Sequence, residues 1–371
     1  MKTKLFIQLF CLLVIFNYSK AQVSQTPSDS NLTQEEKRFN DSVAAVNQTS
    51  QTLQEAHEAY NAGIEKFKNN QFSESISLFD KAILLKPDFV EALYNRGIAK
   101  MHTKDFQSAY DDFCAITKLD NNLKMYIKRA EAAVALKNYE LGVKEYDFII
   151  SRDANNPENY YFKGEALFLT GNYKDASDAF TKAVTLNNRY AKAFNDRGSC
   201  KMKLKDYAGA AKDYEMAVTI DLTMAYGFNN LGSAKKKAGD LNAAILYYGK
   251  AMQADPNYYI ALNNRGSIYL KQEKFTEAMA DFDKAISLNK NYAPIYNNRG
   301  IALLKQKQYD KAIAEFDKAI IIQPNYGVAY LNRGITFEAL GKPENACNDW
   351  EKAKELGIDN AGRYANIECE N

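Results

Sequence analysis

Residues 259–292 read YIALNNRGSIYLKQEKFTEAMADFDKAISLNKNY, and residues 293–326 read APIYNNRGIALLKQKQYDKAIAEFDKAIIIQPNY. The two segments are equal in length and align without a gap, with a glycine at the eighth position of each, Gly266 and Gly300. Repetition at a fixed period of 34 residues is typical of solenoids, in which one structural unit is stacked on the next. These segments therefore predict a repeat array rather than a single globular core.

The same register extends over nine segments, one of which is a residue shorter than the others. The predicted repeats are 56–89, 90–122, 123–156, 157–190, 191–224, 225–258, 259–292, 293–326 and 327–360. Position 8 is glycine in all but the third, which has Ala130. Position 20 is small in every segment, position 24 is always aromatic, and position 27 is usually alanine.

Small residues at three fixed positions let two antiparallel helices approach closely, and the aromatic residue fills the gap between one hairpin and the next. Gly171-Asn172, Gly239-Asp240 and Gly341-Lys342 mark the turn inside three of the hairpins. The pattern resembles the tetratricopeptide repeat family, and the resemblance covers residues 56–360. It implies an all-α, right-handed superhelical solenoid of stacked antiparallel helix hairpins.

Two segments precede the predicted repeats. Residues 1–21 carry Lys2 and Lys4, an apolar run from Leu5 to Phe16 and then Ala21, which indicates a secretory signal peptide of bacterial type. A membrane anchor is the alternative, but the apolar run is short for a span. We expect an exported protein that is periplasmic, secreted or surface-associated. The polar residues 22–55 predict a tether, with a possible helix from Thr33 to Val46.

The other end predicts a cap. Residues 361–371 form an amphipathic segment whose Tyr364 and Ile367 would cover the last repeat. Cys347 lies in the ninth repeat and Cys369 in this segment, so we hypothesise a disulfide between them, with two free thiols as the alternative. Cys114 and Cys200 are expected to be buried small apolar residues.

Several classes of function find no support. Removal of residues 1–21 leaves acidic and basic residues almost equal in number, which does not favour nucleic-acid binding. The two histidines, His57 and His102, lie in different repeats, and no phosphate loop, metal motif or nucleophile motif occurs. We expect no enzymatic activity, no cofactor and no metal. Acidic residues such as Asp281 and Asp283, beside Lys284, are expected to be solvated surface.

The resemblance implies that the first helix of each hairpin lines a concave surface. Asparagines recur at positions 5 and 6 of that helix, and a carboxamide can both donate to and accept from an extended peptide backbone. The candidate peptide-binding asparagines are Asn95, Asn195, Asn229, Asn230, Asn263, Asn264, Asn297, Asn298 and Asn332, and Asp196 takes position 6 of the fifth repeat. Contacts between neighbouring hairpins are the alternative role for the asparagines.

Lysines at position 13 form a predicted basic stripe beside these asparagines: Lys68, Lys203, Lys237, Lys271 and Lys305. They would favour an acidic or carboxylate-bearing ligand; their alternative role is to interact with the helix dipole. The carboxylate clamp of co-chaperone repeats is incomplete, because Tyr60 and Ile64 replace its first pair. We therefore expect a scaffold or adaptor that binds a protein or peptide in its groove. The alternative is an envelope or surface component that assembles through its ends or convex face.

Overall fold

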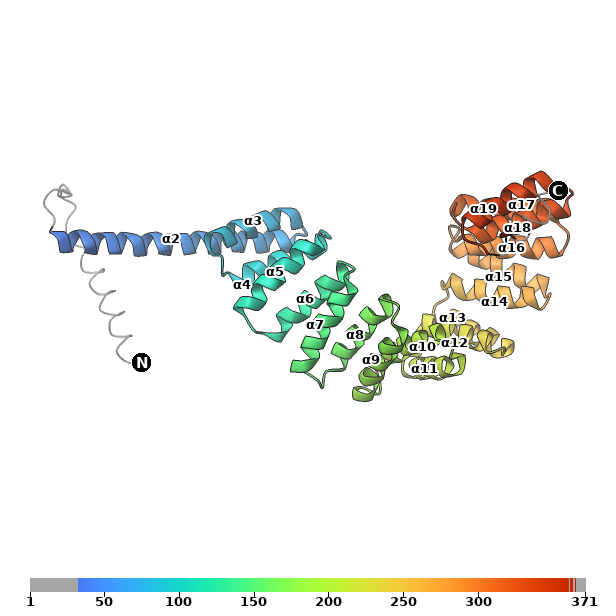
Figure 1. Cartoon of the computed structure of the whole chain (residues 1–371), viewed down its shortest axis with the longest axis horizontal. Coiled ribbons are helices and arrows are strands. Elements are labelled where there is room, and N and C mark those ends of the chain that lie inside the picture. Colours follow the sequence, from blue (N-terminus) through green and yellow to red (C-terminus); the bar gives the residue numbers. More distant parts are fainter. Residues whose placement is uncertain (1–32, 360, 363, 365–371) are drawn as a thin grey trace. The chain divides into compact units, whose positions relative to one another are not determined.

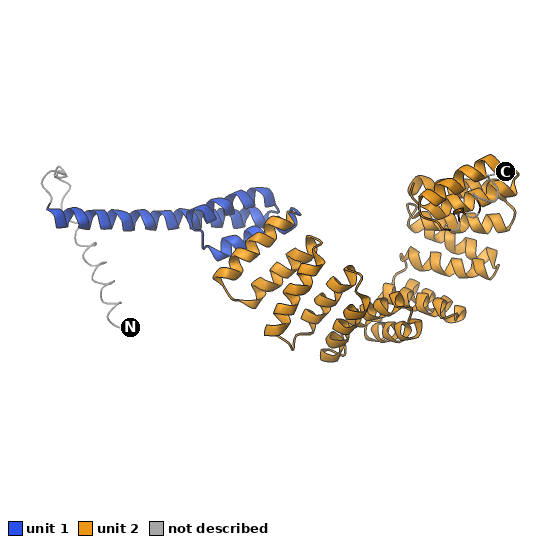
Figure 2. Cartoon of the chain, in the orientation of Figure 1, with its two compact units in different colours: residues 1–104 blue, residues 105–371 orange. Residues whose placement is uncertain are grey.

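The computed structural model describes residues 33–359, 361, 362 and 364, and every regular element in this part of the chain is a helix. The described residues fall into two compact units, one within residues 1–104 and the other within residues 105–371 (Figure 2). The described residues of the first unit form the helices α2 (Gln34–Lys68), α3 (Phe72–Leu85) and α4 (Val90–His102). None of the described helices combines the length and apolar character needed to cross a membrane.

The second unit is a succession of antiparallel helix pairs (Figure 1). Its helices are α5 (Phe106–Leu119), α6 (Leu123–Ala135), α7 (Tyr139–Arg152), α8 (Pro157–Leu169), α9 (Tyr173–Leu186), α10 (Ala191–Lys203), α11 (Tyr207–Ile220), α12 (Ala225–Lys237), α13 (Leu241–Ala254), α14 (Tyr259–Lys271), α15 (Phe275–Leu288), α16 (Ala293–Lys305), α17 (Tyr309–Ile322), α18 (Gly327–Ala339) and α19 (Pro343–Glu355). The all-α repeat array predicted from the 34-residue period is confirmed.

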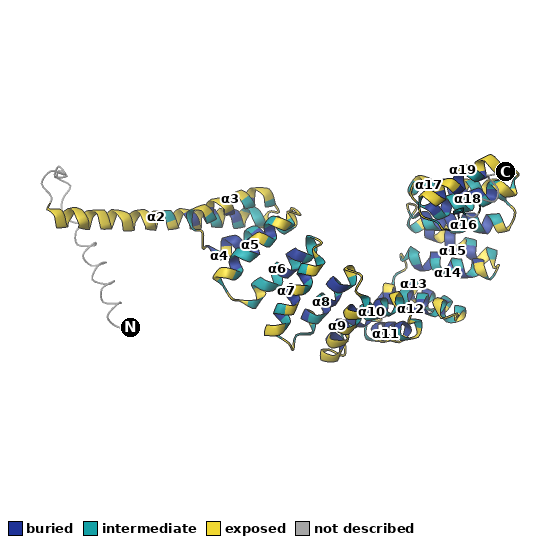
Figure 3. Ribbon diagram, in the orientation of Figure 1, coloured by how far each residue is buried: buried dark blue, intermediate teal, exposed yellow. Residues whose placement is uncertain are grey.

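Close packing within each pair depends on the glycine at position 8. A Cβ atom placed on Gly164, Gly266 or Gly300 would lie 2.6–2.7 Å from the ring of the position-24 aromatic in the same repeat. These rings, Phe180, Phe282 and Phe316 in the same order, are fully buried. The aromatic residue therefore covers the glycine of its own hairpin, and Phe180 also belongs to a buried cluster that includes Ala193 and Phe194 of the next repeat. The buried residues follow the interior of each pair (Figure 3).

The turn between the two helices of a pair always contains one residue with positive φ, at position 15. Glycine occupies it in three repeats, as at Gly239 (φ 91°), but lysine, glutamate or asparagine does so in the others, as at Lys307 (φ 59°). The residue at position 16, directly after this one, often caps the second helix. The carboxylates of Asp206 and Asp240 accept hydrogen bonds from the backbone N–H groups of Gly209 and Ala243. A non-glycine residue in this conformation is a local strain that the hairpin tolerates.

Helix α2 is longer than the sequence predicts. It begins just after Thr33, where a helix was expected to start, and Thr33 and Glu36 form a capping box in which each bonds to the other's backbone N–H. It then continues through the predicted tether into the first helix of repeat one and ends only at Lys68. No proline interrupts residues 34–68, and the buried residues of α2 are Ala56, Ala59 and Gly63, all within the first repeat.

The last repeat is covered in part by the segment that follows it. Ala361 is buried, and the ring of Tyr364 lies 5.2 Å from that of Trp350. The capping role of residues 361–371 stays a prediction. Ile367 and Cys369 lie outside the described residues, as does the predicted signal peptide, residues 1–21.

Candidate functional site

The first helices of successive repeats in the second unit share one face. Helices α8, α10, α12, α14, α16 and α18 each contact the next in turn, whereas the second helices pack mainly against the first helices beside them. We call the surface formed by these six helices the first-helix face. It carries the asparagines at positions 5 and 6 of repeats five to nine.

The asparagines form a regular set of hydrogen bonds between repeats. In each, Nδ2 of the position-6 asparagine donates to Oδ1 of the position-5 asparagine in the preceding repeat, over 2.9–3.1 Å. The pairs are Asn230 to Asn195, Asn264 to Asn229, Asn298 to Asn263, and Asn332 to Asn297. In the first unit, Asn95 donates to the Tyr60 hydroxyl over 3.1 Å. The asparagines of each pair therefore connect neighbouring hairpins, which is the role given above as the alternative to peptide binding.

The two members of a pair differ in burial. Asn195, Asn229, Asn263 and Asn297 at position 5 are between 2% and 7% exposed, whereas the asparagines at position 6 are half-buried. A carboxamide has two N–H groups and an oxygen that accepts twice. The bond between repeats uses one N–H of each position-6 side chain, and no described residue donates to its Oδ1. Position 6 thus keeps free hydrogen-bonding capacity on a half-buried side chain, whereas the position-5 side chains are almost completely enclosed.

The junction between repeats four and five has acidic chemistry instead. Tyr161 takes position 5 and Asp196 position 6; the phenol hydroxyl lies 2.8 Å from Asp196 Oδ2 and 2.9 Å from Glu165 Oε1. A phenol has one hydrogen, so it donates to one carboxylate at a time. Burial raises the pKa of Glu165, and the nearby charge of Asp196 raises it further. Burial also raises the pKa of Asp196, against the effect of its hydrogen bonds from Tyr161 and Asn195.

An arginine at position 7 connects the two helices of a hairpin, which the sequence analysis missed. Arg265 donates through Nε and Nη2 to both oxygens of Asp281, at 2.8 and 2.7 Å, and Arg333 does the same to Asp349. Asp281 is 6% exposed. The expectation that Asp281 is solvated surface is therefore wrong, because α14 and α15 enclose it. The signal was present in the sequence as Arg and Asp or Glu 16 residues apart.

Arginines at position 7 also contact the preceding repeat. Arg299 Nη1 lies 2.6 Å from Asp283 Oδ1, and Arg333 Nη1 lies 2.5 Å from Asp317 Oδ1. Asp283 is thus paired with a charge from the next hairpin, although more than half of its side chain is exposed. The hydrogen bonds that Arg333 donates to Asp349 raise the pKa of Arg333, so this guanidinium stays charged despite its burial. The arginine at position 7 therefore joins the two helices of its own hairpin and also joins that hairpin to the preceding repeat.

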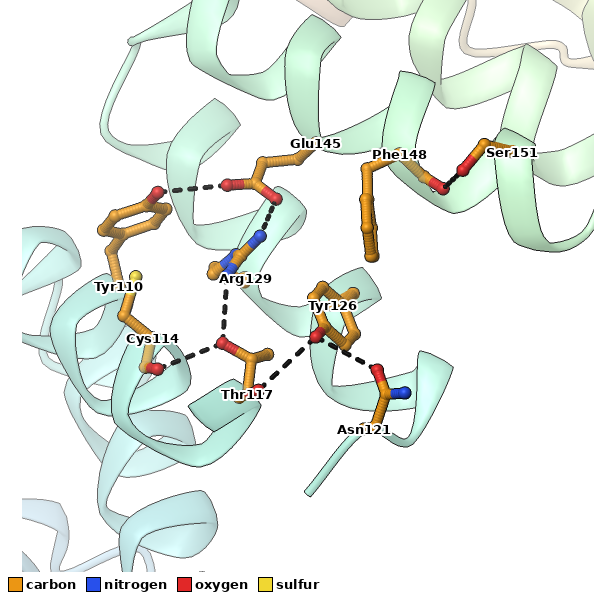
Figure 4. Close-up of polar contacts among 9 residues, drawn as sticks. All are labelled: Tyr110, Cys114, Thr117, Asn121, Tyr126, Arg129, Glu145, Phe148 and Ser151. Carbon is orange, nitrogen blue, oxygen red and sulfur yellow. Dashed lines mark hydrogen bonds and ion pairs between the residues drawn. The ribbon is translucent and has the colours of Figure 1, made fainter. Parts of the chain in front are cut away.

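Arg129 shows how the network adapts where position 25 is not acidic (Figure 4). Position 25 of the preceding repeat is Cys114, and Arg129 donates instead to the Thr117 hydroxyl over 2.9 Å. Its Nη2 pairs with Glu145, which also accepts from the Tyr110 hydroxyl over 3.1 Å. Burial disfavours the charged guanidinium, but the bond to Glu145 outweighs this effect and raises the pKa of Arg129.

The lysines of the predicted basic stripe lie at equivalent places. Lys68, Lys203, Lys237, Lys271 and Lys305 are each the last residue of a first helix, and all are exposed. The partial negative charge of a helix C-terminus favours a cation there. Only weak partners lie near two of them: the Lys305 ammonium is 3.9 Å from Glu273, and that of Lys203 is 5.9 Å from the ring of Tyr173. Their predicted role in ligand binding stays a prediction.

The histidines and cysteines of the described residues contribute to packing. The rings of His102 and Phe72 are stacked at 4.3 Å, and His57 packs edge-on against Phe89 at 4.8 Å. Cys200 is fully buried, as predicted, whereas Cys114 is half-buried. No group of three or more potential metal ligands occurs in the described part of the chain. The predicted disulfide includes Cys369, outside the described residues, and stays a prediction for Cys347.

Comparison with curated proteins finds short matches. Rat (Rattus norvegicus) serine/threonine-protein phosphatase 5 is 29% identical over 108 residues, and a Dictyostelium discoideum homologue of DnaJ homolog subfamily C member 7 is 30% identical over 101 residues. These matches cover 29% and 26% of this chain, and only 22% and 19% of the relatives. The chain thus spans about a fifth of the length of these relatives.

Two solved structures are similar in fold. The chain aligns with a structure from the APC/C hetero-tetramer Cut9–Hcn1 with a TM-score of 0.54 at 13% identity, covering 84% of this chain and 76% of the other. A tetratricopeptide repeat protein of Parabacteroides merdae aligns with the same TM-score at 18% identity, covering 67% of this chain and 98% of the other. At this level of identity the likeness supports the fold alone.

Family models described as tetratricopeptide repeat match residues 60–120, 127–191, 171–223, 225–258, 259–292 and 293–326. Together they cover well over half of the chain and agree with the helix pairs of the structure. Proteins built from this repeat are generally non-enzymatic scaffolds that mediate protein–protein interaction through the surfaces of the stack. The chain belongs to the tetratricopeptide repeat family.

Proposed function

We propose that this protein is a non-enzymatic adaptor that binds an extended segment of another protein along its first-helix face. The observation that carries the proposal is the free hydrogen-bonding capacity of four successive position-6 asparagines: Asn230, Asn264, Asn298 and Asn332. Each carboxamide is held in place by its bond to the preceding repeat, so little side-chain entropy is lost when it binds a ligand. Its free oxygen and N–H suit the amide groups of a peptide backbone.

Backbone recognition of this kind tolerates many side chains, so selectivity must come from other groups on the face. The exposed lysines at position 13 supply positive charge beside the asparagines, which favours a ligand with acidic or carboxylate groups. The position-5 asparagines support the face from beneath, because their buried side chains orient those at position 6.

Matched variants test this role. Asn264→Ala and Asn298→Ala remove groups that would touch the ligand, whereas Asn229→Ala and Asn263→Ala remove their buried supports. We expect each position-6 variant to weaken partner binding about tenfold, the size of one or two lost hydrogen bonds. A partner is first identified by crosslinking the full-length protein in its native cells and mapping the linked sites by mass spectrometry.

Crosslinks near Lys203, Lys237, Lys271 and Lys305 would support the groove, and equal affinity of the position-6 variants and the wild type would contradict it. Because both classes of variant lose the bond between repeats, the position-5 variants control for destabilisation. A loss of affinity in step with stability, irrespective of position, would assign the asparagines a structural role only.

A second candidate function is assembly through the end of the array. The part of α2 that precedes the repeats exposes Phe39, Val43, Val46 and Leu53, with exposed fractions of 67%, 39%, 67% and 40%. Their spacing of four, three and seven residues places them along one side of the helix, as in a coiled-coil seam. We expect Val46→Asp to abolish any self-association seen by light scattering if the helix assembles, and a monomeric wild type would exclude self-assembly through it.

We also propose that the protein acts outside the cytoplasm, on the basis of the predicted signal peptide. Protein purified from its native cells should then begin at Gln22, which N-terminal sequencing would reveal. Recovery of the chain from the cytoplasmic fraction with residues 1–21 intact would contradict export.

A further inference from the structure

One lysine of the first-helix face differs from all those at position 13. Lys236, at position 12 of repeat six, is half-buried, and its ammonium donates to the Ser267 hydroxyl of the next first helix over 2.8 Å. Ser267 in turn donates to the backbone carbonyl of Asn264 over 2.7 Å. The ammonium of Lys236 is therefore anchored between α12 and α14, close to the pair formed by Asn229 and Asn264.

This charge has no acidic partner among the described residues. The contrast with the preceding residue is direct, because Lys235 forms an ion pair with Glu215 over 2.8 Å. The charged groups that act on Lys236 are instead two further lysines, Lys237 at the end of α12 and Lys271 at the end of α14. Lys236 is thus the anchored member of a group of three lysines at the junction of repeats six and seven.

Such an arrangement is unfavourable without an anion. Burial lowers the pKa of Lys236, and the like charges of Lys237 and Lys271 lower it further. In the next repeat, by contrast, the buried charge of Asp281 has a counter-charge supplied by Arg265. A negatively charged ligand at Lys236 would relieve the repulsion and accept hydrogen bonds from an ammonium that is already held in position.

We infer that Lys236, with Lys237 and Lys271, forms a binding site for a carboxylate of the peptide held on the first-helix face. The inference rests on the proposed peptide binding and deepens it, since it names the group that a preferred ligand carries and the junction at which that group lies. A carboxylate is the anion that an unmodified peptide supplies, and it can come from a C-terminus or from an aspartate or glutamate side chain. The neighbouring Asn264 would hold the peptide backbone beside it.

Three heptapeptides separate these two sources of the carboxylate. All three have an acetylated N-terminus. The first is Gly-Ser-Ala-Gly-Ser-Ala-Gly with a free C-terminal carboxylate, and the second has the same sequence with a C-terminal amide. The third also ends in an amide but has aspartate in place of the central glycine. Each is titrated into the full-length protein whose lysines carry ¹³C-methyl groups, at constant ionic strength. The NMR signal of Lys236 is assigned from its absence in Lys236→Arg.

We expect the Lys236 signal to shift saturably with the first or the third peptide, each of which carries a carboxylate, and the pKa of Lys236 to rise. The signal should stay unchanged with the second peptide, which has no carboxylate. A response to the first peptide alone assigns the site to a C-terminus, and a response to the third assigns it to an acidic side chain. Lys174, exposed on α9, is the reference signal. Shifts at Lys236 no larger than those at Lys174, with every peptide, would overturn the inference.

Substitution gives the second test. Lys236→Met should weaken binding of the responding peptide about tenfold, as expected for loss of a charge-assisted hydrogen bond. Lys235→Met, next to it but already neutralised by Glu215, should leave the affinity within about twofold of the wild type. If Lys236→Met binds as well as the wild type while Asn264→Ala does not, the carboxylate site is contradicted and the peptide groove is supported. If Asn264→Ala binds as well as the wild type while Lys236→Met does not, the carboxylate site is supported and the role of the asparagines in the groove is contradicted.

Discussion

Repeats seven to nine and repeats four to six have the same helix pairs but different polar connections. In repeats seven to nine, every position 6 is an asparagine bonded to the preceding repeat and every position 7 is an arginine bonded to an acidic residue of the second helix. In repeats four to six, position 6 is Phe162, Asp196 or Asn230, and position 7 is Lys163, Arg197 or Leu231. The core positions show no such break, because Gly164, Gly198 and Gly232 all lie against a position-24 ring.

Repeats four and six have Lys163 and Leu231 at position 7 and still form the same helix pairs, so the arginine at this position is not needed to form a hairpin. Where they are regular, each charge or amide has a partner of matching chemistry. Where the regularity ends, charges with poor partners collect on the first-helix face: Glu165 and Asp196 at one junction and Lys236 at another. A charge without a matching partner lowers the stability of the folded protein, while the core around it is the same as elsewhere. Such charges are expected at functional sites, so these two junctions are the candidate binding positions.

Loss of an arginine from the regular repeats should have the largest effect. Arg265→Leu leaves the buried Asp281 carboxylate without its two hydrogen bonds, so we expect the free energy of unfolding to fall by about 3 kcal/mol. Leu231 fills the same position in repeat six, where position 23 is Tyr247 and no carboxylate needs a partner. The variant Arg265→Leu/Asp281→Asn should recover about half of the loss.

Urea unfolding followed by circular dichroism measures these differences. Lys284→Ala, at an exposed site on α15, is the control and should remain within about 0.5 kcal/mol of the wild type. An Arg265→Leu variant as stable as this control would show that the two sets of repeats do not differ in what their polar connections contribute.

Loss of an asparagine bond should have an intermediate effect. Asn298→Ala removes the donor to the Oδ1 of Asn263, whose side chain is 6% exposed. A buried acceptor without a donor costs about 1–2 kcal/mol, which is the expected loss in the same unfolding measurement. Asn257→Ala, at an exposed loop residue, provides the control. An equal effect of the two substitutions would mean that water replaces the bond between repeats.

The acidic junction should respond in the opposite direction. Asp196→Asn would place an amide beside the phenol of Tyr161, as Asn95 lies beside Tyr60 in the first unit, and would remove a carboxylate from a buried site. We expect a gain of about 1 kcal/mol at neutral pH.

The sign of the pH dependence follows from the direction of the pKa shifts. Burial raises the pKa of both Asp196 and Glu165 in the folded protein, so the wild type loses stability as the pH rises through these raised values. The advantage of Asp196→Asn should therefore be present at neutral pH and absent below the ordinary aspartate pKa of 3.8. An advantage that persists unchanged in acid would assign it to packing rather than to charge.

Much of the fold could be predicted because the core positions repeat in sequence. The period, the small residue at position 8 and the aromatic at position 24 are visible one hairpin at a time, and the structure places Gly300 against Phe316 accordingly. The extent of α2 could not be predicted, since Thr33 marks its start but neither proline nor a turn signal marks an end before the first repeat.

The site could be predicted only in part, because its contacts join different helices. The adjacent asparagines at 263 and 264 were recognised, but each bonds to a different neighbour: Asn263 to the following repeat and Asn264 to the preceding one. Asp281 was expected in solvent because a helix considered alone does not reveal that Arg265 lies across it. Lys236 was not singled out, since its lack of an acidic partner is evident only when α12 and α14 are seen together.

The smallest effect should come from the turns, where the two sets of repeats can be compared at one backbone conformation. Lys307 in repeat eight and Gly239 in repeat six have φ of 59° and 91°, and a Cβ on Gly239 would meet no atom within 4 Å. Only the intrinsic preference for positive φ therefore distinguishes them. We expect Lys307→Gly to raise the free energy of unfolding, and Gly239→Ala to lower it, by about 0.5 kcal/mol each. Changes of the same sign in both variants would show that side-chain contacts, rather than backbone strain, determine the residue at this turn.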